Sequence, residues 1–312
     1  HTMTQKPLLI SVVGPTAIGK TTTAIALAKA FKTEVLSADS RQFYKEMSIG
    51  TAVPSDEELA EVPHHFIHSK SIFDDYSVGD FERNAVEFLS EKFFPSDPDQ
   101  RTFKTFVMVG GSGLYVDAVI KGLDKFPSVP AGIREKLNEE LLGGGMAQLQ
   151  TELKKVDPDY FEKVDQHNPH RVIRALEVYR ASGKPYSSFL NQKPKERVFD
   201  SILIGLTADR ATIYSRINQR VDMMMSAGLL DEASALYPHR EQNALQTVGY
   251  RELFEFFDGS LSEDKAVEEI KKNTRRFAKR QLTWFKKKPA IHWFDYTTDV
   301  EEIVAFIKKK LP

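Results

Sequence analysis

The sequence predicts an α/β fold in which a parallel sheet is flanked by helices, with an inserted helical domain and a helical C-terminal region. Two observations lead to this prediction. Short apolar, β-branched runs alternate with segments whose apolar residues have helical spacing, and such alternation is typical of a parallel sheet covered on both faces. Between about residues 122 and 195 the alternation stops, and helical patterns follow one another without an intervening strand.

The first predicted element is a strand over residues 8–13, which ends at Gly14. A helix is predicted over residues 21–31, where alanines and leucines recur at helical spacing. Further strands are predicted, with helical patterns between them, at residues 34–38, 66–68, 103–109, 198–206 and 291–294.

Residues 123–197 are predicted to form the inserted helical domain, with helices at 133–142 and 171–181. The entrance DKFPSVPAG and the exit NQKPKERVF both contain prolines, as linkers often do. The α/β core then comprises residues 4–122 and 198–312. Its C-terminal part is expected to be mostly helical and to end in a basic segment.

Composition and charge limit the classes of function. The chain contains 43 Lys and Arg residues and 44 Asp and Glu residues, which gives a formal net charge of −1. Any binding site for a polyanion must therefore be a local basic patch. The absence of cysteine excludes disulfides, thiolate zinc sites and cysteine nucleophiles, and it suits a reducing compartment. No signal peptide or apolar run approaching the ~20 residues of a membrane span is present. We therefore expect a cytoplasmic protein without membrane association.

A glycine-rich segment between the first strand and the first helix fits the pattern G-x-x-x-x-G-K-[ST]. In such loops backbone N–H groups surround a phosphate chain, the lysine reaches its far end and the following hydroxyl is placed to ligate Mg²⁺. The alternative is a glycine-rich turn that contains a lysine by chance. The pattern favours a P-loop NTPase-like fold with a phosphate site at this segment, called the glycine loop below: Gly14, Pro15, Thr16, Ala17, Ile18, Gly19, Lys20 and Thr21.

The carboxylate that usually completes such a site is not where a nucleotide hydrolase would carry it. The strand predicted at 103–109 is followed by Gly-Gly-Ser-Gly, without an acid. Asp39 instead follows the second predicted strand, at the sheet edge that faces the loop in open α/β folds. It could ligate magnesium through water, act as a general base, or simply cap a helical turn.

At this point the motifs resemble those of the tRNA dimethylallyltransferase (isopentenyltransferase) family, in order and spacing and over essentially the whole chain. The resemblance rests on residues 14–21, 37–44, 49–54, 63–65, 76–81, 110–115, 168–177, 248–251 and 274–284. Ile18, His68 and Gln246 depart from the residues common at those positions in the family.

The resemblance implies transfer of a dimethylallyl group from dimethylallyl diphosphate to N6 of the adenine at position 37, beside the anticodon of tRNA. It assigns Asp39 as the general base that takes the proton from the amino group. Lys20, Arg220 and a magnesium ion on Thr21 would stabilise the departing diphosphate, which is the charge that limits such a displacement.

The same resemblance assigns tRNA contacts, with the anticodon stem-loop as the expected partner. Nothing in the sequence demands more than a monomer, and no obligate protein partner is evident from it. These contacts are Asp39, Ser40, Arg41, Gln42, Ser112, Arg134, His170, Arg171, Arg174, Gln246, Gly249, Tyr250, Arg251, Lys279, Arg280, Gln281 and Trp284.

Independently of the family, residues 271–288 contain nine Lys or Arg and no acid. On a helix Arg276 and Arg280 form one i,i+4 pair and Arg275 and Lys279 another, which makes a cationic stripe suited to phosphates. The alternative is a solvated helix face over an aromatic seam.

Two other functions are compatible with parts of the sequence. A small-molecule kinase using ATP would also need the glycine loop and an acid after the second strand. A non-catalytic RNA-binding protein would need only the basic segment. His64, His65 and His68 suggest zinc by their spacing, but without acids or cysteines in an array, packing against the sheet edge is the better interpretation.

Overall fold

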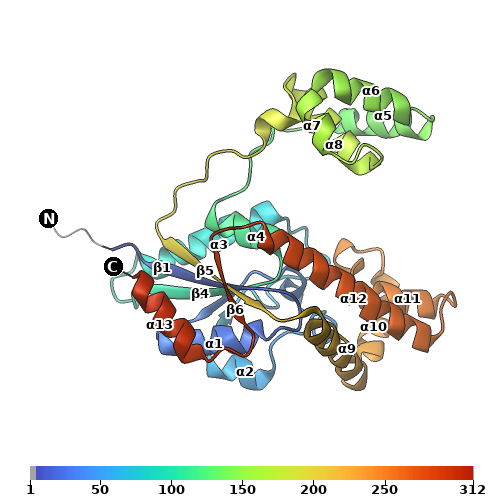
Figure 1. Ribbon diagram of the computed structural model, residues 1–312. Helices are drawn as coiled ribbons and strands as arrows, with labels where there is room; N and C mark the ends of the chain where they lie inside the picture. Colours follow the sequence, from blue (N-terminus) through green and yellow to red (C-terminus); the bar gives the residue numbers. More distant parts are fainter. Residues whose placement is uncertain (1–4, 312) are drawn as a thin grey trace. The chain divides into compact units, whose positions relative to one another are not determined.

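The computed structural model describes residues 5–311 and contains one six-stranded sheet in which every strand pairing is parallel (Figure 1). The strand order is β3-β2-β4-β1-β5-β6. The α/β fold with a parallel sheet flanked by helices is therefore confirmed. The strands are β1 (Leu8–Val13), β2 (Val35–Ser37), β3 (His64–His65), β4 (Thr105–Val109), β5 (Asp200–Thr207) and β6 (Ile291–Asp295).

The central strand β1 is buried along its whole length because helices cover both faces of the sheet. Leu8, Ile10 and Val12 pack on the side of α1 (Lys20–Ala30) and α13 (Val300–Lys310). Leu9 and Val13 pack on the side of α3 (Val78–Phe93) and α4 (Gly113–Ile120). The two-residue period of a strand thus supplies both halves of the core.

One predicted strand was wrong in position. The edge strand β3 is His64–His65, whereas the sequence predicted 66–68. Phe66 and His68 have φ values of 68° and 54°, in the left-handed region, so the extended backbone cannot continue through them. His65 packs at the sheet edge, where its ring centroid lies 4.6 Å from that of Phe88.

Helices gather at the carboxyl ends of the strands (Figure 1). They share a separate apolar core that includes Met47, Val221, Leu229, Tyr250 and Ile270. The helices of this core are α9 (Arg210–Ser226), α10 (Leu229–Leu236), α11 (Arg251–Phe257) and α12 (Glu263–Lys286), whereas the short helix α2 (Asp56–Glu61) has no buried residue and lies outside it.

The chain divides into two compact units. The first unit runs to Lys121 and resumes at Glu196, and the second unit is Gly122–Lys195. All secondary-structure elements of the second unit are helical: four α-helices and one short 3₁₀ turn. This unit has its own core around Leu137, Leu153 and Leu176. Its helices are α5 (Ala131–Leu142), α6 (Met146–Val156), α7 (Pro158–Lys163) and α8 (Pro169–Ser182).

Helix α8 begins two residues before the predicted start at 171. Asn168 caps it by accepting hydrogen bonds from the backbone N–H groups of His170 and Arg171, and Pro169 occupies the first helical position. Among the described residues, no helix combines the length and apolarity that crossing a bilayer would require.

Candidate active site

The glycine loop connects β1 to α1 at the carboxyl edge of the sheet. Gly19, with φ of 104°, precedes the first residue of α1, and no side chain caps this helix. The N-terminus of α1 therefore presents its first N–H groups and the positive end of its dipole without a competing side-chain acceptor. The side chain of Ile18 is buried in the core and takes no part in the site.

Lys20 lies at the base of the loop, where Nζ donates hydrogen bonds to the carbonyl oxygens of Gly14 at 3.0 Å and Pro15 at 2.9 Å. Burial lowers the pKa of the Lys20 ammonium from 10.5 to about 8; the charge of Asp39 opposes this change and that of Arg220 adds to it. An anion bound in the loop would therefore stabilise the charged form of Lys20.

Asp39 follows β2 and caps a 3₁₀ turn over Ser40–Phe43, in which its Oδ1 accepts a hydrogen bond from the Arg41 N–H at 3.0 Å. The capping role considered for Asp39 is therefore present. Among the described residues, Oδ2 accepts no hydrogen bond. The carboxylate lines a pocket of about 340 Å³, called the central pocket below, and one of its oxygens is free for a second task.

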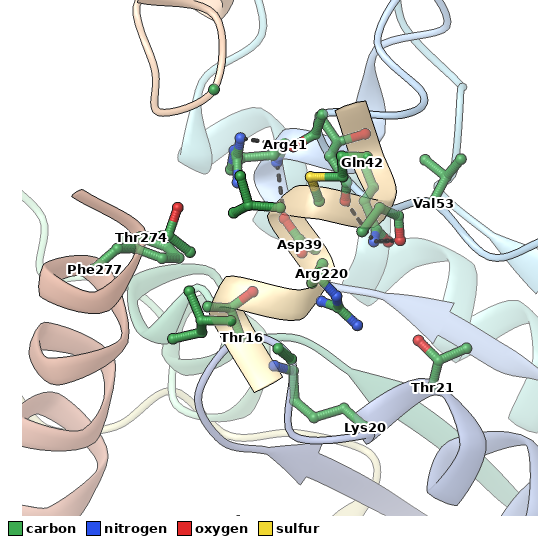
Figure 2. A pocket seen from close by; sticks show the side chains of 18 of the residues that line it. Thr16, Lys20, Thr21, Asp39, Arg41, Gln42, Val53, Arg220, Thr274 and Phe277 are labelled. Atoms are coloured by element: carbon green, nitrogen blue, oxygen red, sulfur yellow. Dashed lines mark hydrogen bonds between the residues drawn. The ribbon is translucent and has the colours of Figure 1, made fainter. Parts of the chain in front are cut away.

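Side chains from several elements converge on the central pocket (Figure 2). The glycine loop and α1 contribute Thr16, Lys20 and Thr21, and the turn after β2 contributes Asp39. Helix α9 contributes Arg216 and Arg220, α12 contributes Thr274, Phe277 and Gln281, and the segment 50–54 forms a further wall, with Glu58 from α2 beside it.

Arg216 is a site residue that the sequence analysis missed. Its Nε donates a hydrogen bond to the carbonyl oxygen of Ala17 in the glycine loop at 2.7 Å. It lies one helical turn before Arg220 on α9, and this four-residue spacing was the available signal. Burial, and after it the charge of Arg216, lower the pKa of Arg220, although a guanidinium keeps its proton in proteins.

Helix α12 packs directly on the glycine-rich end of β4. A Cβ atom on Gly111 would lie 2.3 Å from Nε2 of Gln281, and one on Gly113 would lie 2.2 Å from the Trp284 ring. Gln281 accepts a hydrogen bond from the Thr16 N–H at 2.8 Å and donates one to the Gly111 carbonyl at 3.0 Å. A side chain at Gly111 or Gly113 would therefore collide with α12 as it is packed here.

The structure brings together some of the expected tRNA contacts and separates others. Asp39, Arg41, Gln42, Gly249 and Gln281 line the central pocket. The side chains of Gln281 and Tyr250 are buried and bonded within the protein. Ser40 and Ser112 are close, with 3.3 Å between the Ser40 backbone nitrogen and Oγ of Ser112. The remaining expected contacts in this unit are exposed: Gln246, Arg251, Lys279, Arg280 and Trp284.

In the second unit, Arg134 and Arg174 both donate hydrogen bonds to the buried carboxylate of Glu177, at 2.6 and 2.7 Å respectively. Arg174 also lines a cavity of about 370 Å³, together with His170 and Arg171. Tyr160, Lys163, Val164 and Tyr186 complete that lining. Three of the four expected contacts of this unit thus lie at one cationic, aromatic surface, and the fourth, Arg134, is linked to it through Glu177.

The central pocket offers oxygen donors to a hard cation. Thr21 and Asp39 both line it, and Mg²⁺ typically combines one or two such oxygens with substrate phosphates and water. Among residues 5–311, no cluster of three or more His, Cys, Asp or Glu side chains is arranged to hold a metal by itself. The residues present therefore fit a magnesium ion brought with a diphosphate better than a metal held by the protein alone.

Comparison with known proteins gives one consistent result. The family model for IPP transferase matches residues 42–288. A tRNA dimethylallyltransferase of Flavobacterium johnsoniae is 55% identical over 309 residues, covering 97% of this chain and 98% of its own. One of Christiangramia forsetii is 55% identical over 303 residues, with the same coverage.

Solved structures agree with these sequence matches. The full-length tRNA isopentenylpyrophosphate transferase of Bacillus halodurans has a TM-score of 0.71 and 38% identity, covering 98% of this chain and 97% of that one. A eukaryotic dimethylallyltransferase acting on tRNA has a TM-score of 0.79 and 25% identity, covering 97% of this chain and 80% of that one.

Proposed function

This chain belongs to the IPP transferase family, and from that premise we propose how its central pocket prenylates tRNA. The enzyme is a prenyltransferase that moves a dimethylallyl group from dimethylallyl diphosphate to N6 of adenine at position 37 in tRNA. The observation that carries the proposal is the convergence of Lys20, Arg220 and Asp39 on one pocket beside the glycine loop.

The glycine loop holds the diphosphate of the donor. The N-terminus of α1 supplies N–H donors, and Lys20 and Arg220 supply positive charge where the C–O bond breaks and negative charge grows on the leaving diphosphate. Such charge stabilisation in a partly dry site is usually the largest catalytic contribution. A magnesium ion, held by the Thr21 hydroxyl with phosphate oxygens and water, would neutralise part of the same charge.

Asp39 is the general base. The N6 lone pair attacks the allylic carbon, the bond from that carbon to the diphosphate oxygen breaks, and the proton from N6 passes to the free Oδ2 of Asp39. A positioned base of this kind contributes typically 10²- to 10⁴-fold. The products are N6-dimethylallyladenosine in tRNA and diphosphate.

The tRNA partner is gripped through its anticodon stem-loop. Lys279 and Arg280 on the exposed face of α12 would meet phosphates, and the cationic surface of the second unit would meet further nucleotides. RNA recognition of this kind generally uses an unpaired base that leaves the stack. Because its substrate is tRNA, we place the enzyme in the cytoplasm.

Phosphoryl transfer from ATP is not favoured. The family match names a different reaction, and the strand that would carry the kinase carboxylate ends in glycines packed against α12. A kinase also has no use for the exposed cations of α12.

Incubation with labelled dimethylallyl diphosphate, ATP and unmodified tRNA tests the proposal. We expect label in tRNA and, after digestion and mass spectrometry, prenylated adenosine. Production of ADP without label in tRNA would support a kinase, and tRNA retention without either product would support a binding protein.

A further inference from the structure

One carboxylate outside the central pocket fixes a loop that forms part of its wall. Glu232 on α10 accepts hydrogen bonds at Oε1 from the N–H groups of Ser48 at 2.9 Å and Ile49 at 3.0 Å. Its Oε2 accepts from the N–H groups of Ile49 at 3.1 Å and Gly50 at 3.0 Å. Three successive backbone donors are thus gathered on one charged group, an arrangement stronger than hydrogen bonds between neutral groups.

Tyr250 completes this arrangement from the other side. Its hydroxyl donates a hydrogen bond to Oε2 of Glu232 at 2.7 Å. Burial, and after it the charge of Glu232, raise the pKa of Tyr250, so the hydroxyl stays protonated and remains a donor. A Cβ atom on Gly50 would lie 2.6 Å from the Tyr250 ring, so only glycine allows this approach.

The fixed loop in turn holds the side chains of Arg41 and Gln42, which lie two and three residues after Asp39. Arg41 donates from Nη2 to the carbonyl oxygen of Gly50 at 3.0 Å, and Gln42 donates from Nε2 to the carbonyl oxygens of Thr51 and Ala52, each at 3.2 Å. Arg41 also donates to the carbonyl oxygen of Val248 at 2.6 Å, beside Tyr250.

The chain of contacts ends at the general base. The Arg41 N–H is the donor that fixes Oδ1 of Asp39, and Asp39 caps the turn that carries Arg41 and Gln42. Figure 2 shows these three residues beside one another. The direction of the free Oδ2 therefore depends on a turn anchored through the loop over residues 48–52, which is itself anchored by Glu232.

We propose that Glu232 is a positioning residue for the transfer reaction: it acts through the loop over residues 48–52 and through Arg41 and Gln42 to hold Asp39 in its reactive orientation. This inference rests on the proposed role of Asp39 as general base. Glu232 itself touches no substrate, since it does not line the central pocket.

Glu232→Gln isolates this role. An amide offers one acceptor oxygen and a donor NH₂ group, so one side of the side chain would oppose a backbone N–H instead of accepting it. We expect the single-turnover rate to fall by about 10- to 100-fold, as misplacement of a reacting group by a fraction of an ångström can cost. The affinity for inorganic pyrophosphate stays unchanged because the glycine loop is untouched. Asp231→Asn, an exposed change on the same helix, is the matched control and keeps the wild-type rate.

A double-mutant cycle with Asp39→Asn gives the decisive readout. If Glu232 acts through Asp39, Glu232→Gln lowers the residual rate of Asp39→Asn by no more than about twofold. A purely structural effect would instead multiply the two losses, and that result overturns the inference, as does a wild-type rate for Glu232→Gln alone. A near-normal rate for Asp39→Asn alone would overturn the general-base proposal and not merely this extension of it.

Tyr250→Phe provides a second variant should Glu232→Gln fold poorly. It removes one hydrogen bond to Glu232 and keeps the three backbone donors, so we expect a smaller loss in rate. Combined with Asp39→Asn, it should again lower the residual rate very little, so that the two losses are not additive. Additive losses in this cycle would also contradict the inference.

Discussion

Lys20 is buried in the glycine loop, yet its proposed role requires the charged ammonium, and in the free protein burial disfavours that charge. It lies within the loop for which we propose a bound diphosphate, and burial there lowers the pKa of its ammonium to about 8. A bound diphosphate restores the preference for the charged form, so ligand binding and protonation are linked.

This linkage gives a pH dependence with a definite sign. Below about pH 8 the free enzyme already carries the Lys20 proton and binds pyrophosphate with full affinity. Above that pH, binding must take up a proton, and the affinity falls by up to about tenfold per pH unit. The Lys20→Arg variant stays charged throughout. The ionisation of pyrophosphate affects both proteins equally, so it cancels in the ratio of the wild-type affinity to the variant affinity. Isothermal titration from pH 6 to about pH 9.5 measures both. A constant ratio would show that Lys20 does not titrate there.

Asp39→Asn separates the two roles of this residue. The amide oxygen can still accept the Arg41 N–H and so preserve the turn, but the side chain can no longer take a proton. We expect turnover to fall by roughly 10²- to 10⁴-fold while tRNA and pyrophosphate affinities are retained. Single-turnover rates and filter binding provide the comparison, and near-normal turnover would remove the general-base role.

The sequence could predict Lys20, Thr21 and Asp39 because a phosphate loop and the residue after a strand leave local patterns. The contacts of Glu232 and Gln281 within the protein leave no such local pattern: Glu232 bonds to Ser48, 184 positions away, and Gln281 to Thr16, 265 positions away. Only the folded chain brings these pairs together.

At the scale of the element, α12 has two faces with different tasks. Its inner face holds Gln281 and Phe285 against the glycine-rich end of β4, while Lys279 and Arg280 are exposed. The sequence predicted the cationic stripe from i,i+4 spacing. The family resemblance added Gln281 as a tRNA contact; in the structure Gln281 lines the central pocket, and its amide accepts a hydrogen bond from Thr16 and donates one to Gly111. The predicted position of the edge strand β3 was wrong because Phe66 and His68 have a left-handed backbone, which the pattern of apolar residues does not indicate.

Replacing Lys279 and Arg280 together by glutamine should weaken tRNA binding and reduce its salt dependence. Each lost phosphate contact lowers the slope of log affinity against log salt by about 0.7 to 0.9. Pyrophosphate affinity should not change.

Lys308→Gln with Lys309→Gln removes the same charge from exposed positions on α13 and serves as the control. Binding titrations at several salt concentrations measure the slopes. Equal slopes for the wild type and the α12 variant, or equal losses in both variants, would exclude α12 as the phosphate contact.

At the scale of the whole molecule, two units with separate cores carry the two groups of expected contacts. Leu137, Leu153 and Leu176 are fully buried in the core of the second unit, whose residues come only from that unit. The prolines at the two linkers indicated this division from the sequence, whereas how each side chain packs required the folded chain.

Separate cores imply separate unfolding. Leu176→Ala should destabilise the second unit by about 2–5 kcal/mol and lower one calorimetric transition only. Leu9→Ala, in the sheet core of the first unit, should lower the other. Differential scanning calorimetry distinguishes the two, and a single transition that both substitutions lower equally would show that the units unfold as one.

The central claim is that the glycine loop grips a diphosphate that leaves carbon. The most direct measurement follows pyrophosphate, ADP and prenylated adenosine in one reaction that contains enzyme, unmodified tRNA, dimethylallyl diphosphate and ATP. We expect pyrophosphate and prenylated adenosine to rise together in equal amounts while ATP is unchanged. Conversion of ATP to ADP, with dimethylallyl diphosphate left intact, would contradict the account.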